Sequence, residues 1–179
     1  LETQDVATLR SSQIEGWSST QLNQLLPGQV AALGVSQVGI LSTRLLAGMD
    51  TDHFGSLTTA QLNVLTRVQV ATFNSAQIHA LDTGQIQALR PTVISALTTS
   101  AFSGIDGSQM LALTQGQVGQ LATSQIDALS TSQIAAISTT ALTGLRVPQL
   151  QSMLTDQIRA LTTDQVANLS ASQLLSLST

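Results

Sequence analysis

The chain has 179 residues, of which only 9% are charged, and its formal net charge is −4. All six basic residues are arginine, and such sparse positive charge argues against nucleic acid or anionic membranes as partners. The absence of cysteine excludes disulfides and thiolate metal sites, and no apolar run approaches the roughly 18 residues of a membrane span. The hydrophobic content of 42% is too high for a disordered Ser/Thr-rich tract.

An eight-residue repeat runs from Glu2 to Leu177 without insertion or deletion, which gives 22 consecutive octads. Positions five and eight are apolar in every octad, and the consensus is (Ser/Thr)-Thr-x-Gln-(Ile/Val)-x-Ala-Leu. The octad at 162–169, Thr-Thr-Asp-Gln-Val-Ala-Asn-Leu, shows it well. We therefore treat residues 1–179 as a single repeat array. Because the chain opens at Leu1 and not at Met, we expect it to be a segment of a longer protein.

One continuous helix cannot use this repeat, because eight residues at ~100° each would shift the apolar stripe by ~80° per octad. The polar positions instead predict one short helix per octad, with its N-cap at position one. Position four then becomes the third helical residue, and it is Gln in sixteen octads, as the Ser/Thr-x-x-Gln capping box requires. In chain order, the capping residues are Ser18, Gly34, Ser42, Asp50, Thr58, Thr66, Asn74, Asp82, Thr98, Asp106, Thr114, Ser130, Ser138, Thr162 and Ser170.

Proline supports the same frame. Pro27 and Pro91 fall at the first helical position and Pro148 at the second, where a missing N–H costs no helical hydrogen bond. We predict an all-α solenoid of helices of six or seven residues, in which positions five and eight line one core and small residues at position seven allow close approach. The alternative is a β-solenoid, but Gln, Ala and the Leu at position eight favour helix.

A longer period lies above the octad. Position four departs from Gln at five sites between octads 6 and 18, which are Leu45, His53, Val93, Ala101 and Ala141. Leu45, Val93 and Ala141 are spaced six octads apart, as either one broad superhelical turn or two coils of three octads would require. We interpret the five as sites that relieve packing strain, and the alternative is that they mark a specialised face.

The candidate cation ligands are Asp50, Asp52 and His53, since two carboxylates and an imidazole lie within four residues. In the octad frame they are helix-start residues, and acidic side chains favour helix N-termini on dipole grounds. The sequence therefore predicts no metal site and no cofactor.

Catalytic patterns are equally sparse. His79 and Asp82 lie three residues apart, but no nucleophile-elbow Gly-x-Ser-x-Gly accompanies them, so we expect solvated surface and no enzyme. Arg44, Arg67 and Arg90 are 23 residues apart and would line one edge if a coil held three octads.

Two resemblances follow from the repeat. Thr-x-x-Gln-Val, as in Thr162 to Val166, resembles the opening of the TAL-effector repeat, whose longer unit and basic base-reading loop are absent, so DNA binding is not implied. The Thr-Thr-x-Gln-Ile-x-Ala-Leu tract resembles low-charge repeat segments of large bacterial surface and secreted proteins. That resemblance implies a secreted or cell-surface module with a spacer or adhesive role.

The expected function is a structural or protein-interaction scaffold that associates end to end or with another protein. The alternative is a binding surface for ice, a glycan or another ligand, built from exposed threonines at position two such as Thr59, Thr83 and Thr131.

Overall fold

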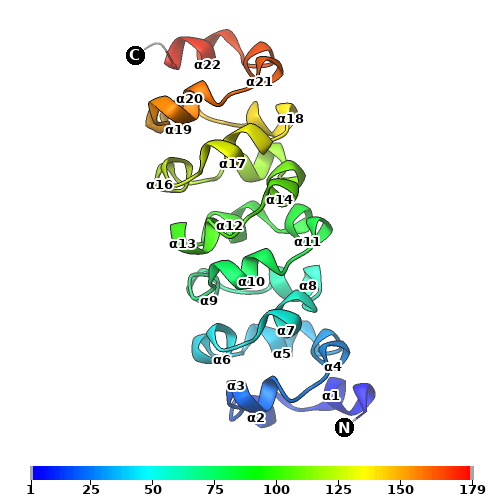
Figure 1. The fold of residues 1–179 in the computed structure, drawn as a ribbon. Helices are drawn as coiled ribbons and strands as arrows, with labels where there is room; N and C mark the ends of the chain where they lie inside the picture. Colours follow the sequence, from blue (N-terminus) through cyan, green and yellow to red (C-terminus); the bar gives the residue numbers. More distant parts are fainter. Residues whose placement is uncertain (1, 178–179) are drawn as a thin grey trace.

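A computed structural model describes residues 2–177 of the chain, and in this part it contains 22 short α-helices, one for each octad, and no β-strand. The helices are joined by turns into a stack that rises from α1 at one end to α22 at the other (Figure 1). The predicted all-α solenoid is therefore confirmed.

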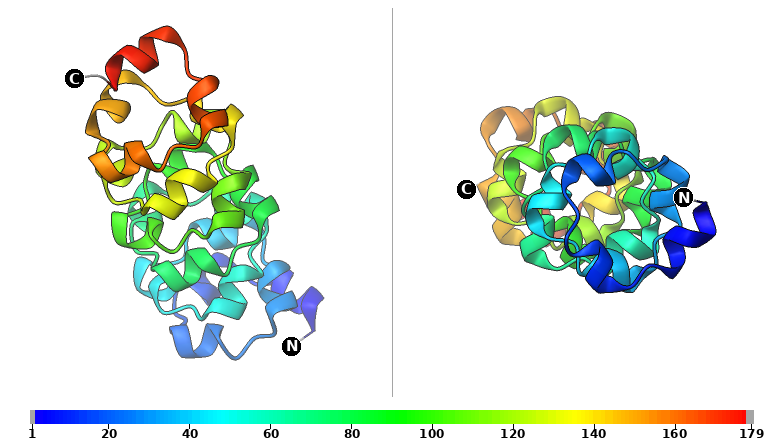
Figure 2. Two further views of the ribbon diagram at one scale, coloured as in Figure 1. Left: turned by 45° about the horizontal axis from the view of Figure 1, so that its top comes forward. Right: turned by 90° about the horizontal axis from the view of Figure 1, so that it is seen from below.

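Three octads make one coil of the solenoid. The extensive contacts between helices all join a helix to the one three further along, as α11 joins α14 and α15 joins α18. Viewed along the stack, successive coils lie over one another (Figure 2). The six-octad period therefore corresponds to two coils, and the described helices fall into three columns.

Column 1 contains α1 (Thr3–Thr8), α4 (Pro27–Ala31), α7 (Thr51–Gly55), α10 (Ser75–His79), α13 (Thr99–Phe102), α16 (Thr123–Asp127), α19 (Val147–Ser152) and α22 (Ala171–Ser176). Column 2 contains α2 (Ser11–Ile14), α5 (Val35–Gly39), α8 (Thr59–Asn63), α11 (Thr83–Ala88), α14 (Gly107–Ala112), α17 (Thr131–Ala136) and α20 (Thr155–Arg159). Column 3 contains α3 (Ser19–Leu22), α6 (Thr43–Ala47), α9 (Arg67–Val70), α12 (Pro91–Ile94), α15 (Gln115–Val118), α18 (Thr139–Leu142) and α21 (Thr163–Ala167).

The helices begin where the capping rule places them. The predicted Ser, Thr, Asp and Asn caps each accept a hydrogen bond from the backbone N–H of position four, as Thr58 accepts from Gln61 at 3.2 Å. Gly34 is also an N-cap residue but has no side chain to accept such a bond. Every capping residue has an extended backbone, which turns the chain sharply into its helix.

The described helices are four to six residues long, so six of them reach the predicted length of six or seven and the others are shorter. The reason lies in the last turn, where the N–H of position eight returns to the carbonyl of position five, as Leu41 does to Val38 at 3.1 Å. This tighter i→i−3 turn ends the α-helix early and releases position eight into the link to the next cap.

Positions five and eight form one continuous apolar core, as predicted. At position five, the side chains from Val6 to Leu150 are all at most 1% exposed. Phe54 and Phe73 meet edge to face in this core, with ring centroids 4.7 Å apart. A six-residue helix cannot bury enough surface to fold alone, so the array is stabilised by stacking of coils.

Candidate functional site

The side chain of the position-four glutamine connects each helix to itself and to the coil before it. Its Oε1 accepts the backbone N–H of its own N-cap residue at 2.5–3.1 Å in all sixteen glutamine octads. This is the capping-box half of the interaction, and it was predicted from the sequence.

The other end of the same side chain reaches the preceding coil. The Nε2 donates to the backbone carbonyl 28 residues earlier at 2.6–2.9 Å, as Gln61 does to Leu33 and Gln117 does to Leu89. Eleven further glutamines make the same bond, from Gln37 to Gln173. Most also donate to a second carbonyl, as Gln117 does to Ile86 at 2.7 Å. We call this set of bonds the glutamine ladder.

Sequence reasoning missed the second half of the ladder, although one signal for it was present. A capping box accepts Glu as readily as Gln. The chain nevertheless has no Glu at position four in any of its 22 octads. A carboxylate could cap the helix but could not donate to the carbonyls of the preceding coil, so the use of Gln without any Glu indicates that the polar side chain at this position acts as a donor.

The five departures from Gln lie inside this contact between coils and are buried there. Their exposed fractions are 6% or less, and they belong to α6, α7, α12, α13 and α18. Leu45, Val93 and Ala141 all lie in column 3, on alternate coils, where they replace a ladder bond with apolar packing. His53 and Ala101 lie in column 1, so the five side chains lie in two columns and are internal to the stack.

Glycine accompanies three of these departures. Gly48, Gly104 and Gly144 stand at position seven of the octads of Leu45, Ala101 and Ala141. A Cβ on Gly104 would lie 2.1 Å from the carbonyl oxygen of Ser75, and one on Gly144 would lie 2.2 Å from that of Gln115. Since no glycine in the described chain has a positive φ, close approach between coils, and not turn conformation, requires glycine here. The predicted role of small residues at position seven is confirmed at these positions.

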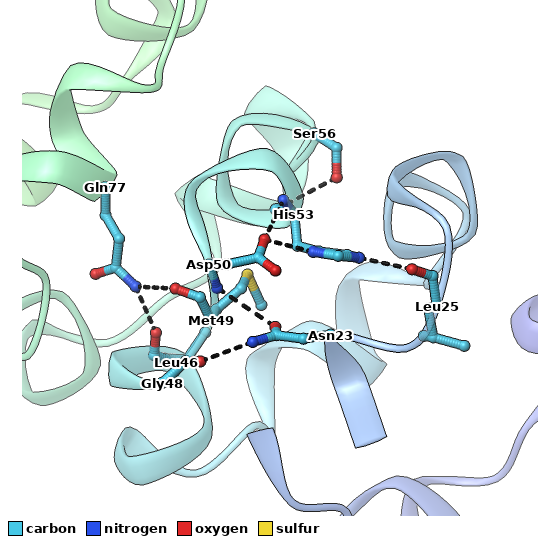
Figure 3. A network of polar contacts seen from close by, with 9 residues as sticks. All are labelled: Asn23, Leu25, Leu46, Gly48, Met49, Asp50, His53, Ser56 and Gln77. Carbon is cyan, nitrogen blue, oxygen red and sulfur yellow. Dashed lines mark hydrogen bonds and ion pairs between the residues drawn. The ribbon is translucent and has the colours of Figure 1, made fainter. Parts of the chain in front are cut away.

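His53 takes the place of glutamine in a different way (Figure 3). Its Nδ1 lies 2.5 Å from Oδ1 of Asp50, its own N-cap residue, and its Nε2 lies 2.6 Å from the carbonyl oxygen of Leu25, 28 residues earlier. The imidazole thus makes the same two connections as a ladder glutamine. Both of its neighbours are hydrogen-bond acceptors, so the protonated ring, with a proton on each nitrogen, satisfies both contacts.

The pKa shifts of His53 and Asp50 favour the charged form of both side chains, in agreement with these contacts. Burial alone would lower the pKa of His53, but hydrogen bonds to the Leu25 carbonyl and to Asp50 outweigh it and raise the pKa above its ordinary value. Burial tends to raise the pKa of Asp50, and the hydrogen bonds and charge of His53 outweigh this and lower it.

In a glutamine octad, Oε1 accepts the backbone N–H of the N-cap residue, and His53 has no atom that does so. An asparagine accepts this N–H instead. The N–H of Asp50 donates to Oδ1 of Asn23 at 3.3 Å, and Nδ2 of Asn23 donates to the carbonyl of Gly48 at 3.1 Å (Figure 3). Asn63 does the same for the octad of Val93, accepting the N–H of Arg90 at 2.8 Å and donating to the carbonyl of Ala88 at 2.9 Å. An asparagine at position six, four octads earlier, therefore takes over the capping-box acceptor of glutamine for two of the departing octads.

The three candidate cation ligands do not point to a common site. Asp50 and His53 are committed to each other and to the preceding coil, while Asp52 is exposed on α7. Among residues 2–177, no group of three or more His, Cys, Asp or Glu side chains could hold a metal ion.

The remaining candidates lie on the outer surface. His79 pairs with Asp106, 3.7 Å away, and both side chains are well exposed, so the pair contributes little. Asp82 caps α11. Arg44, Arg67 and Arg90 belong to α6, α9 and the N-cap of α12, so they do lie in one column, on successive coils.

These contacts define the chain as an α-solenoid of octapeptide repeats with three short helices per coil. The family model of the ALTTAQ repeat matches residues 1–35. The six letters of that name coincide with positions seven, eight and one to four of the octad consensus, as Leu57-Thr58-Thr59-Ala60-Gln61 illustrates. No curated protein matches the sequence. No helix within residues 2–177 is long and apolar enough to cross a membrane.

Proposed function

We propose that the chain is a non-enzymatic scaffold, a spacer that holds attached elements at a separation set by the number of coils. The observation that carries this proposal is the glutamine ladder, which ties each coil to the one before it through bonds that recur in most octads. Both histidines support it, because His53 is used to join coils and His79 pairs with a surface carboxylate.

A spacer with this construction has a length that changes in steps of one coil. Removal of residues 146–169 deletes three octads and leaves Gln173 to donate to the carbonyls of Val118 and Leu121, which Gln149 uses in the parent chain. Because Gln149 and Gln173 make the same bond to the carbonyl 28 residues earlier, the shortened chain should close over the gap.

Spin labels test this at Thr3→Cys and Ala171→Cys, two exposed positions in a chain with no native cysteine. The distance distribution between the labels should be narrow, and deletion of residues 146–169 should shorten its mean while leaving it narrow. A broad distribution in the parent chain would remove the basis for a spacer.

The second candidate function is a threonine-lined binding surface. Thr59, Thr83, Thr131 and Thr155 recur at position two of α8, α11, α17 and α20 in column 2, and Gly107 interrupts the row. A thermal-hysteresis measurement on the parent chain, and on one with Thr83→Val and Thr131→Val, tests an ice-binding role. Activity that does not depend on these threonines would oppose it.

A further inference from the structure

A strip of basic and aliphatic side chains lies on the side of the stack, where columns 2 and 3 meet. Arg67 and Arg90 are exposed, and neither has an ion-pair partner among residues 2–177. Val64 and Val68, which flank Arg67 in the sequence, are 41% and 70% exposed. The strip continues from one coil to the next, because the backbone N–H of Arg90 donates to Oδ1 of Asn63 at 2.8 Å. We call Val64, Arg67, Val68 and Arg90 the basic strip.

An acidic groove lies on another side of the stack, where columns 1 and 2 meet. Helix α10 packs over α7 (Figure 1), and the groove at this junction is lined by Asp52, His79 and Asp82. Asp52 is exposed on α7, and Asp82 caps α11 through its Oδ1. Neither carboxylate has an ion-pair partner in the described part of the chain. The groove therefore carries two unpaired negative charges on adjacent coils, as the basic strip carries two positive ones.

We propose that the basic strip of one copy of this chain docks in the acidic groove of a second copy, so that the solenoids associate side by side. Both surfaces belong to the third and fourth coils of the stack, α7 to α12. Because they lie on different sides, each copy offers its strip to one neighbour and its groove to another, which makes the contact heterologous. The inference rests on the scaffold function and extends it, since spacers that associate laterally hold their attached elements in a row.

The charges on the two surfaces have matching positions. Arg67 and Arg90 lie on adjacent coils, as do Asp52 and Asp82, and the separation of coils is the same in every copy. Groups that meet across adjacent coils are typically 27 residues apart. The two arginines are 23 residues apart and the two carboxylates 30, so the pairs lean to opposite sides of the line between coils. Surfaces that face each other exchange left and right, so the pairs lean alike when docked and each arginine meets one carboxylate.

The two valines give the contact an apolar component. Exposed ion pairs contribute little by themselves, whereas the covering of aliphatic side chains is favourable at any salt concentration. Beside its carboxylates the groove is lined by Gly55, Ala76 and Ala80, whose small size leaves room for Val64 and Val68 of the strip. The charges therefore set the register of the two copies, and the valines add to the affinity.

Sedimentation velocity over a range of concentrations tests the contact. At about 20 mM salt the sedimentation coefficient of the parent chain should rise with concentration, and at about 500 mM salt the association should weaken about tenfold, because the charges are screened. Arg67→Glu with Arg90→Glu, the strip variant, should abolish the rise. The matched control is Arg10→Glu with Arg159→Glu, two exposed arginines outside the strip, which changes the net charge equally and should leave the association largely intact.

A mixing experiment tests the pairing of strip with groove. Asp52→Lys with Asp82→Asn, the groove variant, removes the negative charge of the groove, and asparagine can still cap α11 as Asn74 caps α10. The groove variant and the strip variant should each remain monomeric. Their mixture contains one intact strip and one intact groove, so it should form a one-to-one dimer and no larger species.

Val68→Ser tests the apolar component at an exposed position, and it should weaken the association at both salt concentrations. Three results would overturn the contact, namely a parent chain that stays monomeric at low salt and high concentration, association that survives the combined strip and groove variants, or a mixture of the two variants that stays monomeric. Each would leave the spacer proposal standing, since that is measured between labels within one dilute chain. Circular dichroism of each variant confirms that its coils remain folded.

Discussion

The side-chain amide of Gln117 donates to the backbone carbonyl of Leu89 at 2.7 Å, across 28 residues of sequence. The same side chain accepts the N–H of Thr114 through its oxygen, also at 2.7 Å. One residue type thus starts a helix and fixes its distance from the coil beneath. A change of chemistry at either end of the amide removes one of these two roles.

Gln117→Glu is expected to destabilise the chain by about 3 kcal/mol, because a buried carboxylate would face two carbonyls that have lost their donor. The capping oxygen remains, so the loss reports the bond between coils and not the cap. Urea unfolding followed by circular dichroism measures it.

Gln13→Glu is the matched control, since Gln13 caps α2 at the same octad position but no described coil lies beneath it. Its effect should stay within about 0.5 kcal/mol. Equal losses in the two variants would show that the ladder bond contributes nothing beyond capping.

Gly104→Ala should destabilise the chain by about 1–3 kcal/mol, because the new Cβ would stand 2.1 Å from the Ser75 carbonyl and force α13 away from α10. Gly16 occupies the same octad position in the first coil and has no atom near its missing Cβ, so Gly16→Ala should be neutral or slightly stabilising. Thermal unfolding of the two variants compares them, and a neutral Gly104→Ala would contradict the close approach.

The Asp50–His53 pair should make the free energy of unfolding depend on pH. The lowered pKa of Asp50 adds stability above its ordinary value of 3.8, which is lost as pH falls through the folded pKa. The raised pKa of His53 adds stability that is complete below 6.5 and is lost as pH rises through the folded pKa. The contribution of the pair is therefore largest between these two values.

His53→Gln checks this pH dependence, because it reproduces the Asp-x-x-Gln arrangement of Asp106 and Gln109 in the same chain. Urea midpoints of the parent should fall between pH 6 and pH 8.5, and the fall should be much smaller in the variant. His79→Gln is the control, since that side chain is exposed. An equal fall in parent and His53→Gln would exclude His53 as the cause.

Ala141→Gln restores the consensus residue and should nevertheless destabilise the chain by about 1–3 kcal/mol. Ala141 is 1% exposed, and Gly144 in the same octad brings α18 against α15, so there is no room for a longer side chain. Asp5→Gln makes a comparable change on the exposed first coil and should be tolerated. Differential scanning calorimetry of both variants measures the contrast, and a stabilised Ala141→Gln would show that junction spacing adapts freely.

Much of the fold could be predicted from local rules. The octad, the capping residues from Ser18 onward and the apolar positions five and eight are enough to predict the short-helix solenoid and its core. These features depend on hydrogen bonds and burial within a single octad, so the sequence of one repeat contains them. The sequence also shows the cluster of Asp50, Asp52 and His53. It does not show that His53 joins two coils, since the acceptor of its Nε2 is the carbonyl of Leu25, 28 residues away.

Only the tertiary structure decided that three octads complete a coil. The octad period is the same for any number of helices per coil, so it does not specify which carbonyl lies beneath which glutamine. Because three octads complete a coil, position four of one octad lies beside position eight of the octad four units earlier, 28 residues back, and this gives Gln117 its second bond. The same stacking gives Gly144 its close contact with Gln115. The sequence alone determined the unit and its cap, and the packing of successive coils determined what each unit touches.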